Sequence, residues 1–468
     1  MKLLPLAFAL AALTGATAAQ GAAPATLRFD YYHSGTSKAE DFSFDRLVVE
    51  PLPWPGPLAK TLDPLRAGKY FFEVFAASGE PLYSRGFASI YGEWETTGEA
   101  SEMRRTFHES LRFPAPPAGT RLRLVISKRD AQNNFQKVWE IQVDPADMLV
   151  STAQPPRQDV IELEKNGPPE QKVDLLVLGD GYTAAEKPLF RQQAQKFLEA
   201  FFAVSPFKEN RQAFNVWGIV PTAAESGVSR PSTGILRDSP LGATFDAFRS
   251  ERYMLSFENR RWREVAAWAP YEFVLILANS EVYGGGGIYG QYATSAAGNA
   301  WASYVSVHEL GHHIAGLADE YYTSEVAYEA GEIKVEPWEP NVTALLDPAQ
   351  LKWADLLKPG TKLPMAWPKA DFEKHAAEIQ ERRKKIRAEK RPEAEMSALF
   401  AEQAAYETKL LGEGPHAGVV SAFEGANYAA RGYYRPQADC VMFTRDQVPF
   451  CAVCSRALEK VIELYTSK

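Results

Sequence analysis

Two histidines and a glutamate form the part of this sequence with the clearest chemical meaning. His308, Glu309 and His312 follow the order H-E-x-x-H. On a helix, residues four apart lie on the same face, so both imidazoles can bind one zinc ion. Glu309 can then reach a water on the metal and take a proton from it. This geometry is typical of metal-dependent peptidases.

The residues after the motif favour an acidic third ligand. Gly316 lies four residues after His312, where a positive φ can end the helix and turn the chain back. Asp319 then falls where it can reach the metal. We predict His308, His312 and Asp319 as zinc ligands, with the fourth position open for water. Glu320 is the alternative third ligand.

A buried amphipathic helix with merely hydrogen-bonded histidines is the other interpretation of the motif. The spacing, the glycine and the acid together favour the metal site. His313 lies about 100° around the helix from His312. We therefore expect His313 to support the ligands from behind or to lie on the surface.

The N-terminus has the composition of a secretory signal. Lys2 precedes a short apolar run and then small residues. The run is too short to remain as a membrane-spanning helix. We predict a signal peptide over residues 1–19 and an exported protein, secreted or periplasmic, without an integral membrane segment.

The length of 468 residues predicts more than one domain. Hydrophobic residues at 46% and charged residues at 24% are ordinary for globular proteins. The formal net charge of −8 argues against nucleic acid as a partner. Nothing in the composition indicates an oligomeric state.

The pattern of strands and helices predicts an α+β or α/β multidomain protein. Residues 25–150 hold short alternating runs separated by turn-formers, which is typical of an antiparallel β-sandwich. Residues 151–171 are rich in proline and predict a linker. Residues 172–468 alternate buried strands with helices and predict an α/β catalytic domain. Within it, the charged residues 371–411, broken by Pro392, predict an inserted helical hairpin.

A glycine-rich segment precedes the metal helix, over residues 283–295. As a strand, it would offer an edge to which an extended peptide could add by main-chain hydrogen bonds. A flexible loop without a role is equally compatible with this composition.

All three cysteines lie near the C-terminus, at Cys440, Cys451 and Cys454. In an exported protein such a cluster more often forms a disulfide than binds a metal. A zinc knuckle needs a fourth ligand, and no histidine follows Cys454. We predict a disulfide between Cys440 and either of the other two.

The C-terminal part of the chain also holds candidates that could complete the site. Met442 could form the hydrophobic floor that a tight methionine turn provides beneath the metal in metzincins, although an ordinary core methionine is the alternative. The phenol of Tyr433 or Tyr434 could stabilise the oxyanion of a tetrahedral intermediate. Of these two we select Tyr434 as the catalytic candidate.

Several motifs together resemble the IgA-peptidase family of metzincin-like zinc metallopeptidases. They are His308-Glu-Leu-Gly-His312 with Gly316-Leu-Ala-Asp-Glu-Tyr321, Gly179-Asp-Gly-Tyr-Thr183, Asp439-Cys-Val-Met442 and Phe450-Cys-Ala-Val-Cys454. The resemblance covers most of the chain, because that family also places a β-sandwich before its catalytic domain. Gly316 and Asp319 each come one residue later than in the general metzincin pattern, so the interval between them is kept.

The resemblance implies an exported bacterial endopeptidase with one Zn²⁺ per chain. His308 and His312 would hold the metal, Asp319 would be the third ligand and Glu309 the base. We therefore predict a secreted endopeptidase that hydrolyses peptide bonds of proteins, with host glycoproteins such as immunoglobulin A as candidate substrates. The alternatives are an exported glycan- or protein-binding protein with a structural zinc, and a zinc hydrolase acting on a non-peptide amide.

Overall fold

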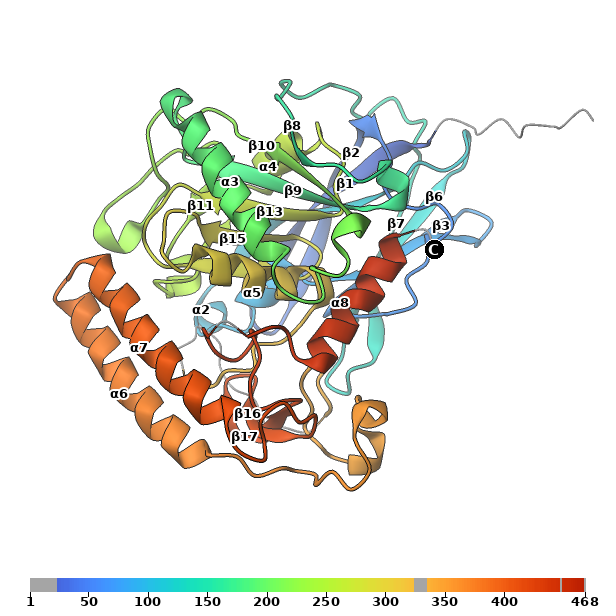
Figure 1. The fold of residues 1–468 in the computed structure, drawn as a ribbon. Coiled ribbons are helices and arrows are strands. Elements are labelled where there is room, and N and C mark those ends of the chain that lie inside the picture. The colour runs from blue at the N-terminus through green and yellow to red at the C-terminus, as the bar shows by residue number, and fades with distance from the viewer. Residues whose placement is uncertain (1–22, 324–334, 447, 467–468) are drawn as a thin grey trace, which may run out of the picture.

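The structure is a computed structural model that describes residues 23–323, 335–446 and 448–466 (Figure 1). The predicted signal peptide lies outside the described residues. Among the described helices, none is long and apolar enough to cross a membrane. The chain is a mixed α/β multidomain protein with antiparallel sheets at its N-terminus, which confirms the coarse fold prediction.

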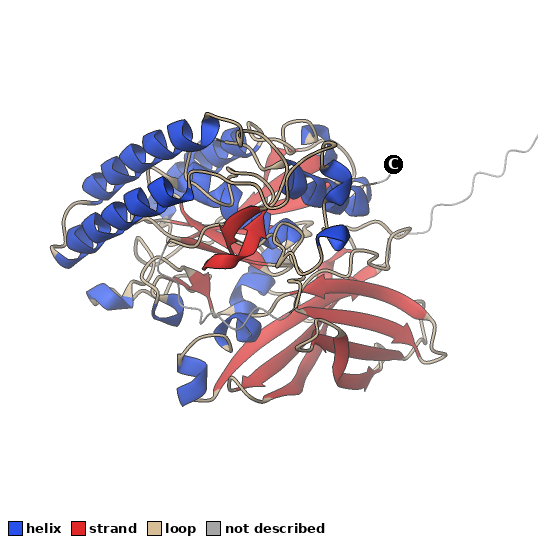
Figure 2. Cartoon of the chain, turned by 90° about the horizontal axis from the view of Figure 1, so that it is seen from below, coloured by secondary structure: helices blue, strands red, loops and turns tan. Residues whose placement is uncertain are grey.

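Two antiparallel sheets face each other in the N-terminal domain (Figure 2). One has the order β2-β1-β5 and contains Glu40–Pro53, Ala25–Gly35 and Arg105–Pro114. The other has the order β4-β3-β6-β7 and contains Pro81–Phe87, Tyr70–Ala76, Leu122–Arg129 and Phe135–Val143. Alternate residues of β1, β3, β5 and β6 form one shared apolar core between the sheets.

A six-stranded mixed sheet forms the centre of the second domain. Its order is β14-β15-β13-β9-β10-β8, with the four middle strands parallel and both edge strands antiparallel to their neighbours. The strands are Gly285–Ile288, Tyr292–Ala296, Phe273–Ala278, Val173–Asp180, Phe214–Ile219 and Ile161–Glu164. β8 thus lies within the segment that the sequence predicts as a linker.

Both faces of this sheet are covered, which explains why its middle strands are continuously apolar. Leu175 and Val177 of β9 face a core formed with α3 (Lys187–Phe201), α5 (Ala302–Ala315) and α8 (Ala452–Tyr465). Leu176 and Leu178 face the other way, toward α4 (Asn259–Ala266), α1 (Ile90–Trp94) and α2 (Glu99–Glu102). The N-terminal domain therefore packs directly against the central sheet.

A pair of long helices, α6 (Lys369–Ala388) and α7 (Glu393–Gly412), lies on the outside of the molecule (Figures 1 and 2). Apolar residues of both helices pack against Tyr283 and Val305, beside the glycine-rich segment and α5. Two short hairpins complete the domain, β11 and β12 (Ala243–Thr244 and Leu255–Ser256) and β16 and β17 (Phe423–Ala426 and Ala429–Arg435).

Candidate metal centre

Helix α5 carries the H-E-x-x-H motif through the buried centre of the domain. Its end is fixed by Gly316, which adopts φ 60° and donates its amide to the carbonyl of His312. Glycine tolerates this left-handed conformation, and a Cβ there would also meet the indole of Trp338 at 2.7 Å. The turn sends residues 317–320 back across the face of the helix that carries the histidines.

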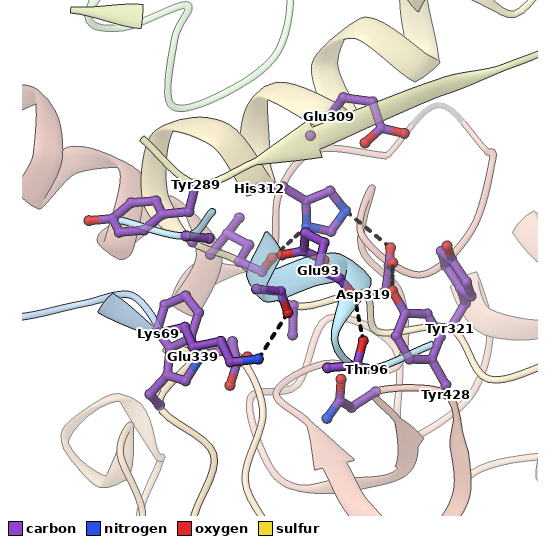
Figure 3. A pocket seen from close by; sticks show the side chains of 18 of the residues that line it. Lys69, Glu93, Thr96, Tyr289, Glu309, His312, Asp319, Tyr321, Glu339 and Tyr428 are labelled. Atoms are coloured by element: carbon purple, nitrogen blue, oxygen red, sulfur yellow. Dashed lines mark hydrogen bonds and ion pairs between the residues drawn. The ribbon is translucent and has the colours of Figure 1, made fainter. Parts of the chain in front are cut away.

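Three predicted ligand atoms meet at this point. Asp319 Oδ1 lies 2.9 Å from His308 Nε2 and 3.2 Å from His312 Nε2, and the two Nε2 atoms are 3.2 Å apart. Figure 3 shows His312 directed toward Asp319 at the floor of the cleft. A zinc ion bound at about 2.0–2.1 Å with tetrahedral angles needs its ligand atoms about 3.4 Å apart. The three ligand atoms are therefore slightly closer to one another than they would be around a bound zinc ion.

Main-chain carbonyls fix the orientation of both imidazoles. His308 Nδ1 donates to the carbonyl of Val441 at 2.9 Å, and His312 Nδ1 donates to that of Leu317 at 2.5 Å. With a proton held on Nδ1 in each ring, Nε2 is the nitrogen that remains for a metal once its own proton has left.

Asp319 and His312 form an electrostatic pair in the metal-free protein. Burial opposes the charge of Asp319, but the two histidines outweigh it and hold the pKa of Asp319 well below its usual range. For His312, burial by itself lowers the pKa. The negative charge of Asp319 outweighs this effect and raises the pKa of His312 to about 9. A bound cation would take over the role of the proton on His312.

Glu309 stands beside the three ligand atoms. One carboxylate oxygen lies within 4.8 Å of a ring nitrogen of each histidine. Burial raises the pKa of Glu309 above its ordinary value, and the charges of His308 and His312 only partly offset this effect. No hydrogen bond joins its carboxylate to another described residue, so the carboxylate can hold a water.

A cleft of about 540 Å³ opens over these residues, and the N-terminal domain forms one of its walls. His308, Glu309, His312 and Asp319 line its floor together with Gly285 and Gly287 of the edge strand β14. The opposite wall contains the following residues of the N-terminal domain: Lys69, Ala88, Gly92, Glu93, Thr96, Arg129, Asp130 and Asn133.

The family model of the IgA peptidase M64 matches residues 161–462, and the model of the peptidase M64 N-terminus matches residues 20–140. The chain belongs to the IgA peptidase M64 family. This confirms the resemblance read from the motifs and makes the protein a metallopeptidase by family. No curated protein matches the chain.

The glycines of β14 let this peptidase bring its edge strand against the catalytic helix. A Cβ on Gly287 would lie 2.4 Å from the carbonyl oxygen of Glu309 and 3.0 Å from Cβ of His312. A Cβ on Gly285 would lie 2.5 Å from Val305. The glycine-rich segment therefore begins as an edge strand packed on α5. The outer N–H and C=O of Gly285 already pair with the main chain of Arg252 and Met254, so peptide addition concerns the part of β14 beyond Gly285.

Met442 and His313 lie on the buried sides of α5. Met442 is fully buried, and a Cβ on Gly311 of α5 would meet its sulfur at 2.9 Å. His313 is also fully buried, and it accepts from the amide of Val274 and donates to the carbonyl of Ile288, both at 3.0 Å. His313 is therefore not on the surface, and its hydrogen bonds go to strands β13 and β14 rather than to the ligands.

The tyrosine nearest to the ligands is one that the sequence did not indicate. Tyr428 donates a short hydrogen bond from its hydroxyl to Asp319 Oδ2, and it lines the cleft. Tyr433 also lines the cleft, whereas Tyr434 is not among the described residues that do. Asn427 and Tyr428 both have positive φ at the tip of the β16–β17 hairpin. That tight turn, rather than the run of tyrosines after it, reaches the site.

The predicted disulfide is not formed. Cys440 Sγ and Cys454 Sγ are 3.9 Å apart, far beyond the bond length of about 2.05 Å, and all three cysteines are free and buried. Glu320, the alternative zinc ligand, points away from the histidines. Its Oε1 lies 3.3 Å from Cys454 Sγ and accepts from the side-chain amide of Asn341 at 3.0 Å.

Proposed function

We propose that this chain is an exported, metzincin-like zinc endopeptidase that hydrolyses peptide bonds of protein substrates. The observation that carries this proposal is the convergence of His308, His312 and Asp319 beside Glu309 on the floor of an open cleft. Membership of a peptidase family supports the reaction class.

The donor set fits zinc. Two imidazole nitrogens and one carboxylate oxygen are ordinary zinc ligands, and three protein ligands leave a fourth position open, as in catalytic sites. The hydrogen bonds on both Nδ1 atoms support the same assignment. When bound, zinc would supply a Lewis acid that acidifies a water and polarises the scissile carbonyl.

Glu309 is the proton carrier in this mechanism. Its desolvated carboxylate, with a raised pKa, is suited to accept a proton from the attacking water and to release it to the leaving amine. Tyr428 is better placed than Tyr434 to donate a hydrogen bond to the oxygen that becomes negative in the transition state. We therefore assign to Tyr428 the role that the sequence suggested for Tyr434.

An extended chain is the substrate shape that the cleft favours. A peptide can add to the edge strand β14 at Gly287, beyond the part that Arg252 and Met254 already cover, between the catalytic domain and the wall formed by the N-terminal domain. Export through the signal peptide would bring the enzyme to extracellular proteins, including host glycoproteins such as immunoglobulin A.

The test compares the wild-type chain with Glu309→Gln. Each protein is incubated with an unfolded protein mixture and with immunoglobulin A, the cut sites are mapped by mass spectrometry, and the zinc content is measured. We expect Glu309→Gln to keep its zinc and lose cleavage, while Glu381→Gln on the exposed face of α6 behaves as wild type. Turnover retained by Glu309→Gln would refute the role of Glu309. Zinc binding without cleavage by the wild type would favour the binding-protein alternative.

A further inference from the structure

Four side chains with metal-binding atoms meet in the core behind the catalytic helix. They are Glu320, Cys440, Cys451 and Cys454, and one ligand atom from each lies within 4.8 Å of those of the other three. All four residues are buried, with exposures between 0% and 4%. The cluster contains every cysteine of the chain.

Three separations within the cluster lie within about half an ångström of those around a tetrahedral zinc. With zinc at about 2.3 Å from sulfur and about 2.0 Å from oxygen, two sulfurs lie about 3.8 Å apart and a sulfur and an oxygen about 3.5 Å apart. Cys440 Sγ and Cys454 Sγ are 3.9 Å apart. Glu320 Oε1 lies 3.3 Å from Cys454 Sγ and 4.0 Å from Cys451 Sγ.

The carboxylate of Glu320 is only partly satisfied by the protein. Its Oε1 accepts from Asn341, but the buried Oε2 has no hydrogen-bond partner among the described residues. Leaving a buried carboxylate without a partner is costly, and a bound cation would remove this cost. The unsatisfied oxygen belongs to the same side chain that reaches the cysteines.

Arg435 balances the negative charge that such a metal site would carry. Its guanidinium is fully buried, and its hydrogen bonds go to main-chain carbonyls of Gly425 and Ala438 rather than to a carboxylate. Burial lowers the pKa of Arg435 to about 10, and its acidic neighbours, Glu320 among them, only partly offset this effect. Three thiolates and one carboxylate around Zn²⁺ leave a net charge of about −2, which a neighbouring guanidinium stabilises.

We propose that Glu320, Cys440, Cys451 and Cys454 bind a second zinc ion, which is structural. Cys451 and Cys454 have the C-x-x-C spacing that zinc sites use, and four protein ligands close the coordination sphere. The fourth ligand that the cysteines lack in the local sequence comes from a segment more than a hundred residues earlier. This assignment does not depend on peptidase activity.

The position of the cluster gives the second metal a mechanical role. Glu320 follows the ligand Asp319 directly, and its amide donates to the carbonyl of Met442 at 2.9 Å. Val441, between Cys440 and Met442, accepts from His308. A metal here would link three segments to one another: the loop that carries Asp319, the segment that orients His308 and the start of α8.

Metal stoichiometry tests this assignment. The full chain is purified with zinc, and zinc per chain is measured for the wild type and for the double variant His308→Ala/His312→Ala. We expect the wild type to hold a second equivalent of zinc and the double variant to keep one. A double variant without zinc, or a wild type with only one equivalent, would overturn the proposal.

Cobalt identifies the ligands. In the double variant, Co²⁺ bound to the cysteines should give intense thiolate-to-metal charge-transfer absorption in the near ultraviolet, and a spectrum without it would refute thiolate ligation. Cys454→Ser should lose this metal, whereas Ser455→Ala, whose hydroxyl bonds the carbonyl of Phe450, should keep it. Glu320→Gln should weaken the binding at least tenfold, and unchanged affinity would remove Glu320 from the ligand set.

Thiol chemistry separates the metal site from a disulfide. If zinc holds the cysteines, the native protein resists a thiol reagent until a chelator is added, and all three thiols then react. Intact mass showing the loss of two hydrogens, together with a single reactive thiol after unfolding, would mean a disulfide and would overturn the proposal. This readout needs no variant, so it stands even if Cys454→Ser fails to fold.

Discussion

Replacing Gly287 with alanine should push the edge strand away from the catalytic helix. The new Cβ would lie 2.4 Å from the carbonyl oxygen of Glu309 and 3.0 Å from Cβ of His312. The oxygen belongs to the backbone of α5, so no side-chain rotation can relieve the contact. The strand and the helix must separate by at least about 0.6 Å to restore a separation of 3.0 Å.

The expected cost has two parts. Overpacking of this kind destabilises a protein by about 1–3 kcal/mol. Displacing Glu309 and His312 by more than half an ångström relative to β14 should also lower kcat/KM by roughly 10-fold to 100-fold, because a misplacement of about 1 Å can cost 10²-fold. The zinc content should stay unchanged, since all three ligands lie on α5 and the loop that follows it.

Thermal unfolding, zinc content and peptide cleavage are measured for Gly287→Ala beside Gly412→Ala. Gly412 ends α7, has no positive φ and has no atom within 4 Å of an added Cβ. Gly412→Ala should therefore keep wild-type activity with equal or slightly higher stability. If Gly287→Ala matched this control in both stability and activity, close packing of β14 on α5 would not be the reason for the glycine.

Two further predictions concern the ligands. Tyr428→Phe should lower kcat about 100-fold at saturating zinc because it removes a donor next to the metal, while Tyr434→Phe should be neutral; equal rates would contradict the assignment. The affinity for zinc should rise about tenfold per pH unit from pH 7 to 9. Asp319 favours a proton on His312, and this proton must leave before His312 can bind the metal. The same raised pKa stabilises the zinc-free fold below about pH 6.5, and this contribution is lost as the pH rises through about 9. Calorimetry in buffers of different ionisation enthalpy measures the proton release, and no release at pH 7 would refute the pairing.

The features that could be predicted from the sequence depend on local geometry. The spacing of His308 and His312 places them on one face of any helix, and Gly316 ends α5 as its φ of 60° requires. The central strands β9, β10 and β13 were predictable because burial on both faces makes them mostly apolar, whereas β8 lies in the predicted linker and the sequence left the glycine-rich segment open between a strand and a loop. Pro392 separates α6 from α7 because proline cannot continue a helix.

The features that the sequence did not indicate depend on contacts between distant segments. Tyr428 and Asp319 are 109 residues apart, and the phenol reaches the carboxylate only because a tight turn directs it there. Tyr434 lies further along the same hairpin, where it pairs with Glu424. The three cysteines predicted a disulfide because the sequence around them contains no fourth metal ligand. Their metal-binding neighbour in space, Glu320, lies more than a hundred residues earlier in the chain.

From the sequence, Asp319 and Glu320 are alternatives for one ligand position, but the structure gives each a separate partner. The two acids are adjacent in the loop after Gly316, yet Asp319 contacts the histidines and Glu320 contacts the cysteines. The loop is also tied to the segment of Met442 by its main chain. A shift of the main chain at Glu320 should therefore also move Asp319, because the two sites share one short segment. The order of the two acids thus determines which site each one serves, and exchanging them would disrupt both.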